Sequence, residues 1–252
     1  MSTDRLERER EFHDRTFGEG SRSVAGRFYS IEAPSRGFYE DFLSRRATGE
    51  VLEYGCGPGS LAFFLAERGA QVTGIDISPV AIEQSRARAE KLGVADRTRF
   101  EVMNAEDLQF EPGSFDLVCG TGILHHLELD GAFAQLAKVL RPGGEAIFIE
   151  PLGHNPIINL YRRFTPKLRT EDEHPLLSAD LDIAGKYFGK SELRYFHLTT
   201  LLAVPAHGRK RFGALVNALA RFDEAVFRRL PPARKHAWMV GMVLAEPRAP
   251  TP

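Results

Sequence analysis

The chain has 252 residues, enough to bury one sizeable core, and no change in composition divides it, so we expect a single domain over 1–252. Its 33 Lys and Arg residues nearly balance 34 Asp and Glu residues, which argues against a nucleic-acid partner, because binding phosphate backbones usually takes a basic excess. The N-terminus lacks the apolar stretch of a secretory signal, and the longest apolar run is too short to span a bilayer. We therefore expect no transmembrane segment and a cytoplasmic location.

The first half of the chain predicts an N-terminal lid followed by a regular α/β unit. Mixed charges with interspersed Leu and Phe predict helices at 4–17 and 35–46, which form the lid, 1–48. From 49 to 151 strands alternate with helices, which is typical of a doubly wound, mostly parallel sheet with helices on both faces. The expected strands are 50–55, 71–77, 98–105, 114–120 and 145–151; the expected helices are 60–69, 78–93 and 131–140, followed by a turn at 141–144.

The regular alternation of strands and helices ends in the last part of the chain, 152–252. Apolar runs predict two more strands, at 193–204 and 236–246, which bring the sheet to seven strands of a Rossmann-like fold. Between them lies a basic amphipathic stretch, 210–230, with apolar residues at helical spacing: Phe212, Leu215, Val216, Leu219, Phe222 and Val226.

A glycine-rich loop follows the first strand in "VLEYGCGPGS". Gly55, Gly57 and Gly59 allow tight turns and a close approach of ligand to backbone. Dinucleotide sites use G-x-G-x-x-G, but here the third glycine comes one residue early. Glu53, just before the loop, would repel a diphosphate and suit an ammonium or sulfonium group. The loop favours a cationic, phosphate-free nucleoside over a nicotinamide dinucleotide.

Two later strands end in residues that suit a nucleoside. Asp76 follows the first glycine by about twenty residues, where an acidic side chain can bind both ribose hydroxyls. Asn104, the Ala105 backbone and Glu106 follow the third strand and can meet an adenine edge. Singly, each is equally explained as a turn, a helix cap or a loop residue; their order along the chain favours a nucleoside site.

From about Glu50 to Pro151 the chain resembles the class I S-adenosylmethionine-dependent methyltransferases, in "VLEYGCGPG", "GIDIS", "NAEDL", "SFDLVCGTGILHHL" and "LRPGG". The resemblance implies S-adenosylmethionine as cofactor and S-adenosylhomocysteine as product. Asn104 departs from the Asp of many relatives, although its amide oxygen can still accept from adenine. The implied cofactor-binding residues are Glu53, Tyr54, Gly55, Cys56, Gly57, Gly59, Asp76, Ile77, Asn104, Ala105, Glu106 and Gly120.

The candidate catalytic residues are His125 and His126, directly after the fourth strand. Methyl transfer is an in-line displacement, which needs alignment above all, and a base only if the acceptor is protonated at attack. Neighbouring helical residues point about 100° apart, so at most one histidine is expected to face the acceptor. We expect His125 to be the base; the alternative is that both rings only pack beside the cofactor.

The acceptor is expected to bind beyond the fifth strand and under the lid. Candidate substrate residues are Tyr29, His154, Asn155, Tyr161, Arg169 and His174, although a loop of ion pairs is the preferred explanation for most of the charges there. A metal held by Asp172, Glu173 and His174 is not expected, because adjacent residues rarely converge on one ion, and two cysteines, Cys56 and Cys119, make no metal framework. The cysteines are expected to stay reduced.

We therefore predict methyl transfer to a small-molecule acceptor, most plausibly at oxygen, with nitrogen or carbon as alternatives. A protein that keeps the cofactor pocket but no longer transfers methyl groups is a further alternative, since a fold does not fix a function. Residues 210–230 are expected to cap the acceptor pocket or to form a homodimer contact, ahead of a membrane-surface helix.

Overall fold

A computed structural model describes residues 3–19, 26–46, 48–59, 61–165 and 173–248. The helices are α1 (Thr3–Glu19), α2 (Gly26–Tyr29), α3 (Ala33–Ser44), α4 (Leu61–Ala66), α5 (Pro79–Leu92), α6 (Leu129–Val139), α7 (Pro156–Phe164), α8 (Ser178–Ile183) and α9 (Phe212–Arg229). The strands are β1 (Glu50–Tyr54), β2 (Gln71–Asp76), β3 (Thr98–Val102), β4 (Phe115–Thr121), β5 (Leu140–Pro151), β6 (Phe188–Phe196) and β7 (Met239–Pro247). Short 3₁₀ turns are η1 (Ala95–Arg97), η2 (Leu124–His126), η4 (Ala184–Lys186), η5 (Thr200–Ala206) and η6 (Pro231–His236).

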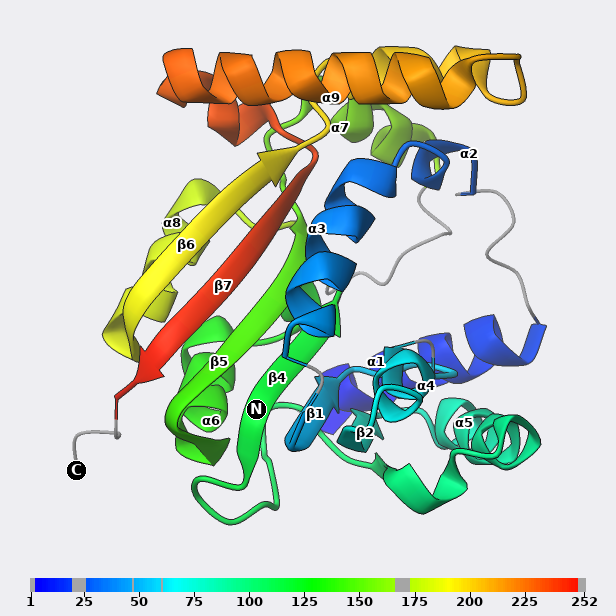
Figure 1. The fold of residues 1–252 in the computed structure, drawn as a ribbon, viewed down its shortest axis with the longest axis vertical. Coiled ribbons are helices and arrows are strands. Elements are labelled where there is room, and N and C mark those ends of the chain that lie inside the picture. Colours follow the sequence, from blue (N-terminus) through cyan, green and yellow to red (C-terminus); the bar gives the residue numbers. More distant parts are fainter. Residues whose placement is uncertain (1–2, 20–25, 47, 60, 166–172, 249–252) are drawn as a thin grey trace.

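The seven strands form one mostly parallel sheet, which confirms the predicted fold class (Figure 1). Its order is β3-β2-β1-β4-β5-β7-β6; the first five strands are parallel, and β7 runs antiparallel to both β5 and β6. The chain order reverses between β1 and β4. In a doubly wound sheet this switch point opens a crevice beyond the carboxyl ends of the strands, where ligands bind.

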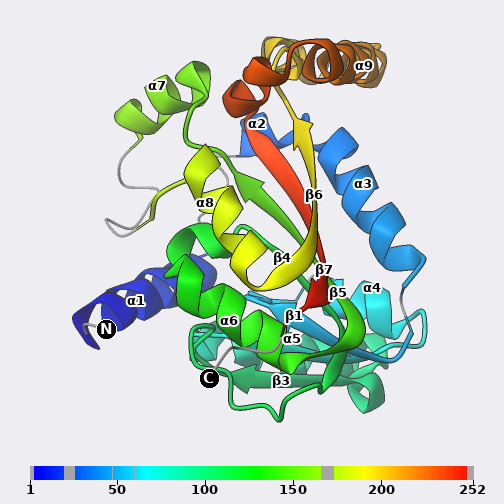
Figure 2. The same ribbon diagram turned by 90° about the vertical axis from the view of Figure 1, so that its left-hand side faces the viewer.

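Helices cover both faces of the sheet (Figure 2). One apolar cluster packs α3, α4 and α5 against the sheet, and a larger one packs α6 and α8 against the opposite face. The predicted caps of α5 are confirmed: Ser78 Oγ accepts from the Ala81 N–H at 3.1 Å, and Gly93 ends the helix at φ +69°. Among the described residues, every helix is too short or too polar to cross a lipid bilayer.

Several predicted boundaries were wrong. The expected strand at 193–204 is β6, which begins at Phe188 and ends at Phe196; His197 then takes a φ of +65° and η5 replaces the rest of the apolar run. The expected turn at 141–144 lies within β5, where pairing with β4 shifts register between Phe115 and Leu117.

Helix α9 docks on its own chain through a polar anchor as well as apolar contacts. Val216 and Phe227 are buried, and between them the buried Asp223 accepts hydrogen bonds from the backbone N–H and hydroxyl of both Thr199 and Thr200, at 2.5 to 3.2 Å. The predicted apolar stripe was partly wrong, because Leu215 and Phe222 are exposed. A carboxylate that satisfies so many donors fixes the helix to the end of β6.

Candidate active site

A cavity of about 290 Å³ lies at the carboxyl ends of β1, β2 and β4, beneath α1. Nine of the twelve expected cofactor residues line it: Glu53, Gly55, Cys56, Gly57, Gly59, Asp76, Ile77, Asn104 and Ala105. Helix α1 adds Arg5, Leu6, Glu9, His13 and Phe17 to the walls, and the loop after β4 adds His126.

The glycine loop has a backbone conformation that residues with a Cβ rarely adopt. Gly55, Gly57 and Gly59 have φ values of +71°, +52° and +69°, in the left-handed region that favours glycine. A Cβ on Gly59 would lie 2.7 Å from the Phe63 ring. Asp76 holds the loop from beneath, since its carboxylate accepts from the Gly57 N–H at 2.8 Å and the Ser78 N–H at 2.9 Å. The bare backbone therefore stays open toward the cavity.

Glu53 places an acidic group in the cavity wall. Its side chain is almost fully buried, and Oε2 accepts from the Ala62 N–H at the start of α4, 2.9 Å away. Burial raises the pKa of Glu53 to about 7, against the lowering effect of the Ala62 and Leu61 N–H groups and with a further rise from Asp76. A cation in the cavity would favour the ionised carboxylate.

Three of the expected cofactor residues do not line the cavity. Tyr54 is fully buried, and its hydroxyl donates to the Ala105 carbonyl oxygen, which positions the wall behind the cavity. The Glu106 carboxylate pairs with Arg5 of α1 and accepts from the Glu128 N–H at 2.6 Å. Gly120 lets β4 pass close to β1, because a Cβ there would lie 2.8 Å from the Tyr54 carbonyl oxygen.

The remaining groups of this region have local roles. Asn104 Oδ1 accepts from the Glu106 N–H at 3.0 Å, so the amide shapes its own loop at the cavity edge. Cys56 and Cys119 are free thiols, and burial raises the pKa of both well above the usual range of a thiol. Neither is suited to act as a nucleophile at neutral pH.

His125 and His126 lie in η2 and contact different partners. His125 Nδ1 lies 2.8 Å from Glu150 Oε2. Glu150 is fully buried, and its Oε1 accepts from the N–H groups of Ile123 at 2.9 Å and Leu124 at 3.0 Å. A carboxylate held this way favours the proton at Nδ1 and leaves Nε2 as the basic nitrogen. His125 Nε2 lies 4.0 Å from Glu173 on the far side of the ring.

His126 belongs to the wall of the cavity, whereas His125 lies next to that wall with its ring centroid 4.2 Å from that of His126. Burial lowers the pKa of His126, against the raising effect of Glu9, which lies 3.2 Å from its Nδ1. The ring is therefore mainly neutral at neutral pH.

The expected substrate residues lie outside the lining of this cavity wherever the structure describes them. Tyr29 is half exposed beside Trp238, and the Tyr161 ring packs 4.6 Å from Phe28. Asn155 caps α7 by accepting from the N–H groups of residues 157 and 158.

The other expected substrate residues also make local contacts. The His154 carbonyl oxygen lies 3.2 Å from His236 Nδ1, and the His174 N–H donates to the His125 carbonyl oxygen at 3.2 Å. Arg169 lies outside the described residues. An ion pair does form in this loop, between Arg162 and Glu173 at 2.8 Å.

Sequence reasoning missed three acidic or basic groups of the site: Glu150, Glu9 and His13. Glu150 had a usable signal, since it is an acidic residue at the carboxyl end of a buried apolar strand, where active-site groups gather in α/β sheets. Glu9 and His13 had none, because they sit in a helix of alternating charges that is typical of a solvated face.

Comparison with known proteins agrees with this geometry. Residues 51–144 match the model of a methyltransferase domain. The chain is 32% identical over 145 residues to a ubiquinone biosynthesis O-methyltransferase of Xanthomonas euvesicatoria, covering 53% of this chain and 59% of that one. It is 40% identical over 104 residues to the 27-O-demethylrifamycin SV methyltransferase of Amycolatopsis mediterranei, covering 40% of this chain and 38% of the other. The match therefore spans less than two thirds of either relative.

Among solved structures, the geranyl diphosphate C-methyltransferase of Streptomyces coelicolor, in complex with Mg²⁺, geranyl diphosphate and S-adenosylhomocysteine, has the same fold. It is 16% identical with a TM-score of 0.61, and the match covers 86% of this chain and 81% of that one. Residues 51–144 are therefore similar to methyltransferase domains, and the sheet around them has the fold seen in that solved methyltransferase structure.

Proposed function

We propose that the protein binds S-adenosylmethionine and transfers its methyl group to an oxygen atom of a small-molecule acceptor in the cytoplasm. The observation that carries the proposal is the cavity at the switch point of the sheet, where the glycine loop, Glu53 and Asp76 meet. The residues fit this cofactor: bare backbone lies where a methionine chain would pass, and Glu53 is a buried acid that a cation would ionise. Asp76 suits the ribose and Asn104 the adenine edge.

When bound, S-adenosylmethionine supplies an electrophilic methyl group on a sulfonium centre. The chain's own residues align the acceptor and exclude water, which is where most of the rate acceleration of a displacement arises. Glu53, Asp76 and Asn104 would hold this cofactor, which would supply the methyl group to the acceptor oxygen and keep the electron pair of the broken carbon–sulfur bond. The hydroxyl proton moves to Nε2 of His125, whose Nδ1 is held by Glu150.

Support for an oxygen acceptor comes from the carboxylate–histidine pair and from the relatives. Glu150 holds Nδ1 of His125, which leaves Nε2 as the nitrogen that can accept the proton of a hydroxyl acceptor. The Xanthomonas relative is named as an O-methyltransferase, and the Amycolatopsis relative is named for a 27-O-demethyl substrate. The balanced charge of the chain supports a small molecule over a nucleic acid.

The test is calorimetric titration of S-adenosylhomocysteine, with NADH as comparison and Asp76→Ala as control, followed by a methyl-transfer assay on a panel of phenols, enols, amines and carbanion acceptors. We expect saturable binding of S-adenosylhomocysteine that weakens in the variant, no binding of NADH, and turnover of hydroxylated acceptors. Turnover only of amines or carbon acceptors would refute the oxygen assignment. Cofactor binding without any methyl transfer would favour a protein that uses the pocket for another purpose.

A further inference from the structure

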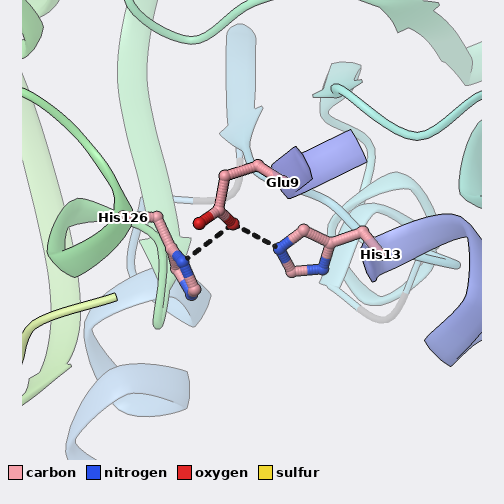
Figure 3. A group of neighbouring side chains, drawn as sticks. All are labelled: Glu9, His13 and His126. Atoms are coloured by element: carbon pink, nitrogen blue, oxygen red, sulfur yellow. Dashed lines mark ion pairs between the residues drawn. The ribbon is translucent and has the colours of Figure 1, made fainter. Parts of the chain in front are cut away.

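Two imidazoles and one carboxylate meet between helix α1 and the loop after β4 (Figure 3). Glu9 and His13 project from α1, and His126 projects from η2. Glu9 Oε2 lies 3.2 Å from His126 Nδ1 and 3.5 Å from His13 Nε2. One potential ligand atom from each of the three residues lies within 4.8 Å of the others.

Glu9 Oε2 lies from each imidazole nitrogen at close to the spacing of neighbouring ligand atoms around one metal ion. In a tetrahedral site with metal–ligand distances of about 2.0–2.2 Å, neighbouring ligand atoms are roughly 3.3–3.6 Å apart. Hydrogen bonding does not fully account for the cluster, because His126 Nδ1 is buried and makes no hydrogen bond of normal geometry to the described residues. The atom is placed to give a lone pair to a cation at the centre of the group.

We propose that Glu9, His13 and His126 bind one divalent transition-metal ion of the zinc class. Two imidazoles and one carboxylate are the ligand set of zinc sites that keep an open fourth position, whereas Mg²⁺ prefers oxygen ligands in an octahedron. All three residues line the cofactor cavity, so the open position faces it. Water or an oxygen atom of the acceptor completes the coordination.

Nearby charges permit this ion. Arg5 lies on the same helix, and its guanidinium pairs with the Glu106 carboxylate and donates to the His126 carbonyl oxygen. A second group of possible ligands, His125, His126 and Glu173, is less suitable. There Glu150 already holds His125, and the Glu173 carboxylate lies 2.8 Å from the Arg162 guanidinium. The group of Glu9, His13 and His126 is more suitable, because all three of its residues line the cofactor cavity, whereas His125 and Glu173 do not.

The ion would tie the lid helix to the core beside the cofactor. Glu9 and His13 come from α1, and His126 comes from the loop after β4, so coordination holds these two segments together above the cavity. Binding of an acceptor oxygen at the open coordination position rests on the proposed function. Metal binding itself does not depend on it.

The test is calorimetric titration of Zn²⁺ into the chelator-treated full-length chain, with the visible spectrum of the Co²⁺ form as a report on coordination geometry. The variants are Glu9→Gln and His13→Ala. Their matched controls are Glu7→Gln, an exposed glutamate on the same helix, and His207→Ala, an exposed histidine outside the cluster. We expect one ion per chain, about 100-fold or more weaker binding in the two ligand variants, and unchanged binding in the controls.

No saturable binding, or equal affinity in Glu9→Gln and the wild type, would overturn the proposal. The thermal unfolding of each metal-free variant shows that a loss of binding is not a loss of folding. Titration of S-adenosylhomocysteine into the metal-free chain separates the two proposals. Metal binding without cofactor binding would sustain this site and refute the proposed function, whereas cofactor binding without metal binding would do the reverse.

Discussion

Ionisation of Glu53 should couple cofactor binding to pH. Burial raises the pKa of this carboxyl to about 7, so about nine tenths of it is protonated at pH 6 and about one tenth at pH 8. A bound ammonium or sulfonium group favours the carboxylate and displaces the proton. S-adenosylhomocysteine carries the ammonium group, and we expect its Kd to be about tenfold higher at pH 6 than at pH 8.

The same shift makes Glu53 costly for the ligand-free fold. A carboxyl with a raised folded pKa stabilises the native state fully below its unfolded pKa of 4.5, and this contribution is lost as pH rises through about 7. The rise of the pKa from 4.5 to about 7 corresponds to roughly 3.5 kcal/mol of unfolding free energy. Glu53→Gln should therefore stabilise the ligand-free chain at pH 8 while it weakens cofactor binding.

Calorimetry in two buffers with different ionisation enthalpies measures both the Kd and the proton released on binding. We expect release near pH 6 in the wild type, none in Glu53→Gln, and wild-type behaviour in the control Glu83→Gln, an exposed glutamate on α5. A wild-type Kd that is the same at pH 6 and pH 8, or a pH dependence of Kd that persists in Glu53→Gln, would show that Glu53 does not couple binding to pH.

Three further predictions concern the loop, the cap helix and the base. Gly59→Ala should abolish measurable cofactor binding and lower the thermal midpoint, because its Cβ would overlap a ring, whereas Gly93→Ala, at the same φ of +69° in open space, should cost only the backbone strain of about 1–2 kcal/mol. Asp223→Ala should lower the free energy of unfolding in urea by about 3–5 kcal/mol, since it leaves buried donors unpaired, and Asp223→Asn by less. His125→Ala should lower kcat by about 100-fold or more in steady-state assays at saturating cofactor, with little change in cofactor affinity, because it removes the base.

Each of these has an outcome that contradicts it. An equal decrease in thermal midpoint in Gly59→Ala and Gly93→Ala would mean that backbone strain alone determines the cost of the change in the loop. An unfolding free energy of Asp223→Ala within about 0.5 kcal/mol of the wild type would show that α9 is held by its apolar contacts. If His126→Ala lost as much turnover as His125→Ala while both bound cofactor normally, positioning would explain the effect and no base would be needed.

The fold of the first half was predictable because its signals are local. The glycine loop, the caps of α5 and the apolar strands each follow from a few adjacent residues. The end of β6 was not predictable in this way: the run 193–204 is apolar throughout, and it breaks because His197 takes a positive φ and Asp223, from a later helix, binds the Thr199 and Thr200 donors. Contacts between distant segments decided that boundary.

The same distinction applies to the site. Apart from Tyr54, the residues expected around the glycine loop line the cavity because the loop itself brings them there. Glu9 and His13 are different, because their burial depends on α1 lying over the cavity. The sequence of α1 shows no apolar stripe that would predict this position. On α9, likewise, the periodicity was visible, but only docking shows that the buried face carries Val216 and that Phe222 points away.

The adjacent histidines illustrate why sequence adjacency did not imply a shared role. Residues in a 3₁₀ turn point about 120° apart, so His125 and His126 meet different surroundings from one short segment. Glu150, from the core sheet, holds His125, and Glu9, from the lid, contacts His126. Displacing the lid would therefore change the surroundings of His126 directly and leave the Glu150–His125 pair intact. It follows that the pH dependence of turnover should survive Glu9→Gln, while any metal dependence should not.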